Sequence, residues 1–123
     1  MTPAIRARLT RLQRLPQDPA EADLLLQEAR DVLGLLKATE ARQVSEALRD
    51  PRFPFGSIQQ ELGRVRASFA VSARGLARAR PYAASQRREL LETAQLVEQA
   101  PLTTVEDLAA IRAARSERPA SVS

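Results

Sequence analysis

The sequence predicts an all-α fold, an antiparallel bundle of four to five helices built on a long helical hairpin. Its composition favours helix, because Ala, Leu, Arg, Gln and Glu dominate the 123 residues and aromatic residues make up only 3%. Prolines and capping residues divide the chain into segments of helical length, and one of these has a heptad pattern of apolar residues. A chain of this length fits a single domain, which we expect to span residues 1–115.

The first two predicted helices are marked by prolines and capping residues. Thr2 is an N-cap candidate followed by Pro3 at the first helical position, and the short helix that they open ends at Pro16. Asp18 opens the second helix in a variant of the capping box, with proline next and glutamate three residues after the cap. The spacing predicts a long helix over residues 18–49, the first arm of the hairpin.

The loop over residues 50–57 holds two prolines and a glycine, and it leads the chain into the second arm of the hairpin. Ser57 is the candidate cap of a helix over residues 57–80. We expect this helix to end there because Pro81 disfavours the α conformation of the residue before it.

Two further helices, over residues 83–100 and 103–115, are expected to pack on the hairpin. The last one opens at a capping box made by Thr103 and Glu106. Residues 116–123 show no periodicity, and we expect a disordered tail there.

The helix over residues 57–80 has an apolar seam with the alternating four- and three-residue spacing of a coiled coil. Its members are Ile58, Leu62, Val65, Phe69, Ser72, Leu76 and Ala79. In an antiparallel hairpin this seam meets the apolar stripe of the preceding helix, with Val44 opposite Leu62. The same register brings Glu40 close to Arg66, so we predict an ion pair between these two side chains at the edge of the interface.

Five apolar residues form a candidate interaction surface. Leu24 and Leu35 share a face of their helix opposite the main stripe, and they need cover from the first helix or from a second chain. Val71 points outward from its helix. Phe53 and Phe55, bracketed by prolines in the loop, are either a core plug at the end of the bundle or an exposed docking tip.

The net charge of +4 is distributed unevenly along the chain. Residues 1–15 have a charge balance of +4, residues 17–50 of −4, residues 62–88 of +7 and residues 89–123 of −3. Segments of opposite sign follow one another, so ion pairs between neighbouring helices can neutralise the basic third helix. Alternatively, some of its arginines face outward and form an anion-binding stripe.

The candidate anion ridge consists of arginines from the third helix and the start of the fourth. They are Arg64, Arg74, Arg78, Arg87 and Arg88. Helical geometry places Arg74 and Arg78 farthest from the seam and one turn apart. These two can meet Glu89 or Glu92 if the fourth helix folds back tightly at Pro81, and otherwise they form an exposed basic ridge.

The composition disfavours catalysis, and we identify no catalytic, cofactor-binding or metal-binding residue. The chain has no His and no Cys, which removes imidazole bases, thiolate nucleophiles and the usual zinc ligands. Carboxylate pairs at helical spacing, Glu28 with Asp31 and Glu89 with Glu92, are typical of solvated helix faces. The four glycines are isolated, so the sequence has no glycine-rich phosphate loop.

These patterns predict a non-enzymatic protein-interaction or adaptor module that associates with itself, as a dimer or another homo-oligomer, or with a different protein. The alternative is a nucleic-acid-binding protein that contacts the phosphate backbone through the arginine ridge and the basic first helix. Aromatic residues for base stacking are nearly absent, which argues against single-strand binding. A membrane partner is disfavoured because the first helix is short and lacks Trp and Phe. No apolar run is long enough to span a membrane, so we expect a cytoplasmic protein.

Overall fold

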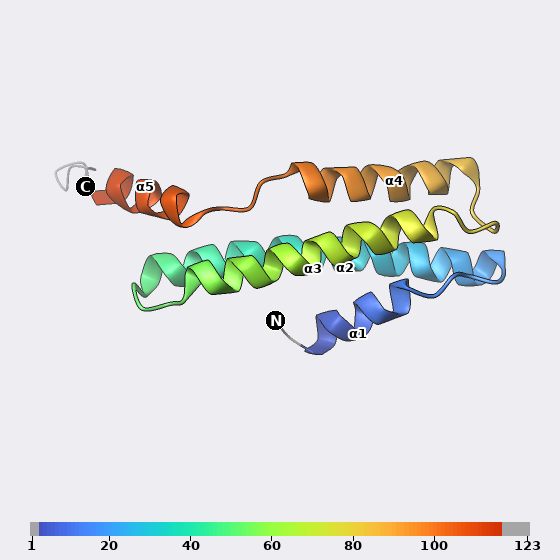
Figure 1. Cartoon of the computed structure of the whole chain (residues 1–123), viewed down its shortest axis with the longest axis horizontal. Helices are drawn as coiled ribbons and strands as arrows, with labels where there is room; N and C mark the ends of the chain where they lie inside the picture. The colour runs from blue at the N-terminus through green and yellow to red at the C-terminus, as the bar shows by residue number, and fades with distance from the viewer. Residues whose placement is uncertain (1–2, 117–123) are drawn as a thin grey trace, which may run out of the picture.

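The computed structural model describes residues 3–116, which form five helices and no strand, as the composition predicts (Figure 1). The helices are α1 (Pro3–Leu12), α2 (Pro19–Arg49), α3 (Phe55–Leu76), α4 (Ala84–Gln99) and α5 (Val105–Ser116). Helices α2 and α3 form the predicted antiparallel hairpin, so the all-α helical bundle is confirmed. The predicted tail covers residues 116–123. Ser116 is the last residue of α5, and residues 117–123 lie outside the described residues.

The other three helices flank the hairpin on two sides (Figure 1). Helix α1 lies along one side and contacts both α2 and α3, whereas α4 and α5 follow one another along the other side. Helix α1 has 10 residues and α2 has 31, so at 1.5 Å per residue they are roughly 15 Å and 46 Å long. One side of the hairpin is therefore covered along much of its length, and the other only in part.

The predicted seam of α3 is the centre of the core. Leu62, Phe69 and Leu76 are fully buried together with Val32 of α2, and the other seam positions are buried or half-buried. On the other side of α3, small residues let α4 approach closely. Ala70 and Ala73 form a buried cluster with Ala94 of α4, and this contact joins the two helices.

The start of α2 confirms the predicted cap. Asp18 has extended backbone angles, and its carboxylate accepts a hydrogen bond from the backbone N–H of Glu21 (2.8 Å). Pro19 occupies the first helical position, where its missing N–H leaves no donor unsatisfied.

The bounds of α3 differ from the prediction at both ends. The helix begins at Phe55, because that side chain is buried against Ala47 and Leu108, and Ser57 is not its cap but donates to the carbonyl of Pro54 (3.2 Å). It ends at Leu76, four residues earlier than predicted. After it the chain tightens into turns that bury two residues, Ala79 and Tyr82, against the main core, which a continued helix would not do.

The capping box of α5 lies one residue later than predicted. The hydroxyl of Thr104 accepts from the N–H of Asp107, and the carboxylate of Asp107 accepts from the N–H of Thr104, both at 3.0 Å. Thr103 does not form the predicted box with Glu106, because its N–H donates to the carboxylate of Glu40 instead (2.9 Å), which ties it to α2.

The buried Tyr82 gives a spectroscopic prediction. Its side chain is 4% exposed, and its hydroxyl has no hydrogen-bond partner within the described part of the chain. Burial first, and the charge of Asp23 second, raise the pKa of Tyr82 from its ordinary value of 10.0 to about 12. Because it is the only tyrosine and the chain has no tryptophan, absorbance at alkaline pH should show it ionising near pH 12 in the folded protein and near its ordinary value in urea.

The same burial makes a prediction about stability. The unfolded chain loses the phenol proton first, so the free energy of unfolding should fall as the pH rises from about 10 towards 12. The Tyr82→Phe variant should lack this alkaline loss and be as stable as the wild type or more so at neutral pH, since the hydroxyl makes no hydrogen bond. A clear destabilisation of Tyr82→Phe at neutral pH in urea denaturation would contradict this environment.

Candidate interaction surfaces

Glu28 and Asp31, one of the carboxylate pairs at helical spacing, have different partners. No group of three or more acidic, His or Cys side chains within residues 3–116 is placed to hold a metal ion. Glu28 of α2 lies 3.5 Å from Arg8 and 3.7 Å from Arg11 of α1, while its helical neighbour Asp31 accepts from a glutamine on the same helix. The carboxylate pair at this spacing is therefore divided between different contacts.

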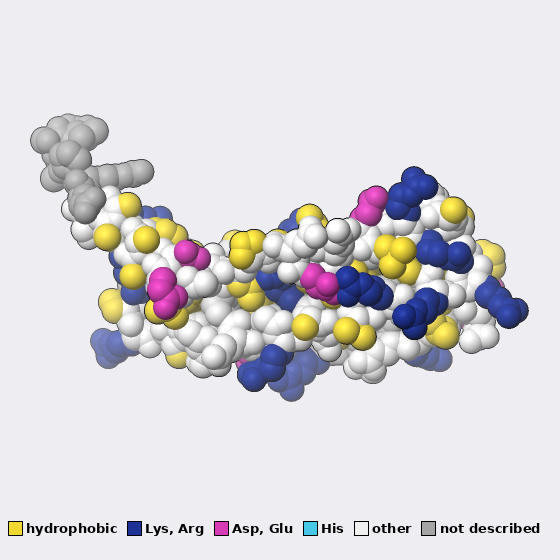
Figure 2. All heavy atoms as spheres, turned by 45° about the horizontal axis from the view of Figure 1, so that its top comes forward, with side chains coloured by type: hydrophobic (Ala, Val, Ile, Leu, Met, Phe, Trp, Pro, Cys, Tyr) yellow, Lys and Arg dark blue, Asp and Glu magenta, His cyan; other side chains and the backbone are white. Residues whose placement is uncertain are grey.

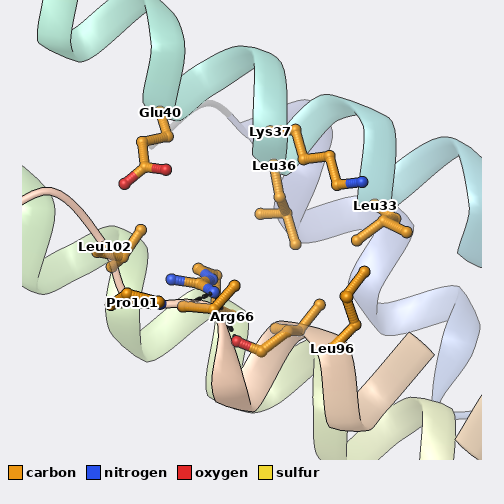
Figure 3. A pocket seen from close by; sticks show the side chains of 10 residues that line it. Leu33, Leu36, Lys37, Glu40, Arg66, Leu96, Pro101 and Leu102 are labelled. Atoms are coloured by element: carbon orange, nitrogen blue, oxygen red, sulfur yellow. Dashed lines mark hydrogen bonds between the residues drawn. The ribbon is translucent and has the colours of Figure 1, made fainter. Parts of the chain in front are cut away.

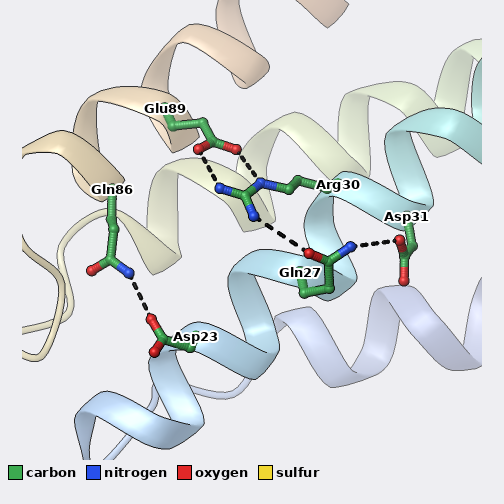
Figure 4. A network of polar contacts seen from close by, with 6 residues as sticks. All are labelled: Asp23, Gln27, Arg30, Asp31, Gln86 and Glu89. Carbon is green, nitrogen blue, oxygen red and sulfur yellow. Dashed lines mark hydrogen bonds and ion pairs between the residues drawn. The ribbon is translucent and has the colours of Figure 1, made fainter.

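A second network fixes α4 to α2 (Figure 4). The guanidinium of Arg30 binds both carboxylate oxygens of Glu89, at 2.6 and 2.7 Å, and Gln86 donates to Asp23 at 2.7 Å. The hydrogen bonds from Arg30 hold the pKa of Glu89 below its usual range. Glu89 therefore binds α2. The predicted alternative, in which Glu89 pairs with Arg74 or Arg78, does not form in the described chain.

Arginines of the first helix are largely used within the bundle. Arg6 forms an ion pair with Glu61 of α3 (3.1 Å), and Arg8 and Arg11 both approach Glu28. These contacts hold α1 against the two arms of the hairpin. The charge of α1 is thereby largely balanced, which weakens the expectation that it contributes to an anion-binding surface.

The outer face of α3 keeps a basic stripe. Arg64 and Arg74 of α3 are exposed, with Val71 (69% exposed) between them. Arg78 is also exposed, but it lies in the turn after α3 and not on the helix as predicted. Arg74 binds Glu98 of α4 through both carboxylate oxygens, and the second of these bonds is 2.8 Å long. Within residues 3–116, Arg64 and Arg78 have no carboxylate partner. Figure 2 shows basic side chains gathered towards the end of the molecule where α3 ends and α4 begins.

Three of the five predicted ridge residues converge on one hollow between α3 and α4. This arginine hollow is lined by Arg74, Ala77, Arg78, Arg87 and Leu91, and its volume is about 440 Å³. The other two ridge residues are exposed outside the hollow. The sequence could not predict this convergence, because it depends on the turns that join α3 to α4.

A different hollow joins two residues of the predicted apolar surface. It has a volume of about 670 Å³ and lies between the start of α1, the middle of α2 and the start of α3. Its apolar lining includes Ile5, Leu35, Phe53 and Ile58, and its polar rim includes Thr39, Arg42, Gln43 and Glu46. We call it the apolar hollow.

The remaining apolar candidates lie elsewhere. Phe55 is 4% exposed and packs in the small core at the loop end of the hairpin, so it is the core plug of the two predicted alternatives. Leu24 is 72% exposed and Val71 is 69% exposed, and neither lines the apolar hollow. Of the five residues of the predicted interaction surface, Leu35 and Phe53 therefore line the same hollow and the other three do not.

The predicted ion pair between Glu40 and Arg66 does not form in the described chain. Both side chains line one cavity of about 90 Å³ (Figure 3), but each has other partners. The carboxylate of Glu40 accepts from the N–H of Thr103, and Arg66 donates to the carbonyls of Val97 and Ala100, both at 2.5 Å. The prediction was wrong because the last carbonyls of α4, which have no partner inside their own helix, compete for the guanidinium.

Comparisons with protein-family models, curated proteins and solved structures find no match to this chain. Of the helices formed by residues 3–116, none is both long enough and apolar enough to cross a membrane. The function must therefore be argued from the two hollows and the contacts around them.

The role of Arg66 can be tested against its neighbour on the same helix. Arg66→Ala removes two hydrogen bonds to the end of α4, so it should lower the free energy of unfolding by about 1–3 kcal/mol. Arg64→Ala, which removes an exposed side chain without a carboxylate partner in the described chain, should change it by less than about 0.5 kcal/mol. Urea denaturation of both variants measures the difference, and equal effects would argue against the capping role.

Proposed function

We propose that the protein is a non-enzymatic, cytoplasmic interaction module that associates with itself through the apolar hollow. The observation that supports this best is the incomplete cover of one side of the hairpin. Helix α1 occupies that side only in part, and the apolar hollow begins where α1 starts, at Pro3 and Ile5. A contiguous apolar depression with a polar rim is typical of protein-interaction sites.

The occupant that we propose is a second copy of the chain, because the rim of the hollow is complementary to itself. Arg42 and Glu46 lie one turn apart on α2, on the face that also holds Leu35. If two α2 helices cross antiparallel about a twofold axis at the level of Val44, Arg42 of each copy lies opposite Glu46 of the other. The same register places Leu35 beside the loop that holds Phe53 of the second copy.

The two rim charges are available for such a contact. Arg42 is exposed and has no carboxylate partner within the described residues. Glu46 pairs with Arg49 on its own helix at 2.7 Å, but the side chains of Arg49 and Glu46 are 69% and 46% exposed, and a surface pair of this kind contributes little. Glu46 can therefore leave Arg49 and bind Arg42 of the second copy at a small cost in free energy.

Light scattering across a range of concentrations tests the proposal. The wild type should reach twice its chain mass of 13.5 kDa, and Arg42→Glu should shift the association to at least about tenfold higher concentration, because like charges then face each other twice. The double variant Arg42→Glu, Glu46→Arg exchanges the two charges and should restore the dimer. Arg14→Glu makes the same charge change at an exposed site beyond the far end of α1, and should leave the mass unchanged.

A monomeric wild type at the highest attainable concentration would refute self-association. A dimer that Arg42→Glu leaves intact would refute this interface. Circular dichroism of each variant should show the helix content of the wild type, so that loss of mass reports on association.

A second candidate function, binding of a nucleic-acid backbone, is supported by the outer stripe of α3. Arg64 of α3 and Arg78, two residues beyond the end of α3, have no carboxylate partner in the described chain. The helix between Arg64 and Leu76 alone spans roughly 18 Å. Arginines spaced along such a stripe can contact several phosphates without reading the sequence.

This candidate predicts salt-dependent binding of a short duplex. Fluorescence anisotropy should show binding at low salt that weakens steeply towards physiological salt and is independent of base sequence. The double variant Arg64→Glu, Arg78→Glu should lower the affinity by about tenfold or more, whereas Arg52→Glu, in the loop at the other end of α3, should have a much smaller effect. No binding at low salt would exclude this function.

A further inference from the structure

We propose that the arginine hollow is a binding site for a phosphate group, and that Glu98 occupies one of its arginines until a ligand replaces it. The site lies between α3 and α4, away from the residues that line the apolar hollow, so it does not depend on self-association. Its support comes from the charges around the hollow, from the start of α4 and from the exposure of the Arg74–Glu98 pair.

The first support is an excess of positive charge. Arg74 of α3, Arg78 of the turn that follows α3, and Arg87 of α4 line one open space of about 440 Å³. Among the described residues, the only carboxylate bound to any of them is Glu98, on Arg74. Like charges at one site repel, and an anion of two or more negative charges would relieve that repulsion.

The second support is the number of unused donors. The side chain of Arg78 has no hydrogen-bond or ion-pair partner in the described chain, and only its backbone N–H is bonded, to the carbonyl of Gly75. Arg87 donates through a single nitrogen to the carbonyls of Ala79 and Tyr82, at 3.2 and 3.4 Å, which are long bonds. Each guanidinium has five N–H donors in a planar fork that matches the oxygens of phosphate, so most donors of these two are free for a ligand.

The start of α4 adds charge of the same sign. A helix has a positive N-terminal end, which acidic residues in the first turn normally balance. The first turn of α4 contains no acidic residue, and its cap position is Ala83, whose side chain accepts no hydrogen bond. Arg87 and Arg88 follow directly, so cations are placed where the helix itself favours an anion.

Glu98 behaves as a replaceable counter-ion. It binds Arg74 through both oxygens, the geometry in which arginine also holds phosphate. The side chains of Arg74 and Glu98 are 43% and 41% exposed, so solvent weakens the pair. The hydrogen bond from Arg74 lowers the pKa of Glu98, which therefore stays charged at neutral pH and competes with any ligand anion.

Removing the charge of Glu98 should strengthen phosphate binding. If the Arg74–Glu98 pair only held α3 and α4 together, its loss would not strengthen binding. We would titrate the full chain with inorganic pyrophosphate at low salt by calorimetry. Glu98→Gln should tighten binding by about threefold or more, which is the range of an exposed ion pair. Glu92→Gln makes the same charge change on the same helix at an exposed residue that binds none of the three arginines in the described chain, and should have a smaller effect.

Substitution of Arg78, whose side chain has no partner in the described chain, should have the opposite effect and weaken binding. Arg78→Gln should weaken pyrophosphate binding by about tenfold, as expected for loss of a charge-assisted hydrogen bond. Arg64→Gln is its matched control, because Arg64 is also exposed and without a carboxylate partner in the described chain but lies outside the hollow. Light scattering of the same variants should show no change in mass, which separates this site from the self-association proposed above.

The same variants, tested with a short DNA duplex, distinguish the source of the phosphate. A duplex that competes with pyrophosphate and responds to both substitutions identifies a nucleic-acid strand as the ligand. Pyrophosphate binding that the duplex does not displace identifies a small phosphate compound, and both results support the site. Absence of pyrophosphate binding at low salt, or equal tightening by Glu98→Gln and Glu92→Gln, would overturn the proposal.

Discussion

The packing of α3 against α2 is the contact on which the rest of the structure depends. Leu62, Phe69 and Leu76 along the seam are fully buried. Helices α1 and α4 each pack against both α2 and α3, so this pair positions them. The small residues Ala70 and Ala73 let α4 lie close, and that close approach brings the arginines of α3 and α4 to one hollow. The charged surface is therefore a product of the way the apolar core packs.

Local and periodic features were predictable from the sequence, and features set by tertiary competition were not. The Asp18 cap and the seam of α3 depend on residues close in sequence, and both are confirmed. The capping box of α5 lies one residue later than predicted, and Glu40, distant in sequence, binds the N–H of Thr103. Likewise, Arg66 binds the end of α4 instead of Glu40. The candidate ridge was predicted as a list of arginines, and its convergence depends on where α3 ends.

The alternating charge of the segments resolves into two groups of arginines. Arginines of one group form ion pairs between helices. Arg30 of α2 binds Glu89 and positions α4, and Arg6 of α1 binds Glu61 and positions α1. The other group, with Arg64 and Arg78, has no carboxylate partner in the described chain. Within the basic segment over residues 62–88, Arg74 is paired with Glu98, whereas Arg64 and Arg78 are exposed, so neutralised and outward-facing arginines occur side by side.

The attachment of α5 has a consequence for dynamics. Of its 12 residues only Leu108 is buried, and its other ties to the hairpin are few, among them the bond from Arg112 to the carbonyl of Ala47. A helix held by so little apolar contact has a small local unfolding free energy. Amide hydrogens of α5 should exchange with solvent well before those of α2 and α3, and each opening would uncover Phe55 without disturbing the seam.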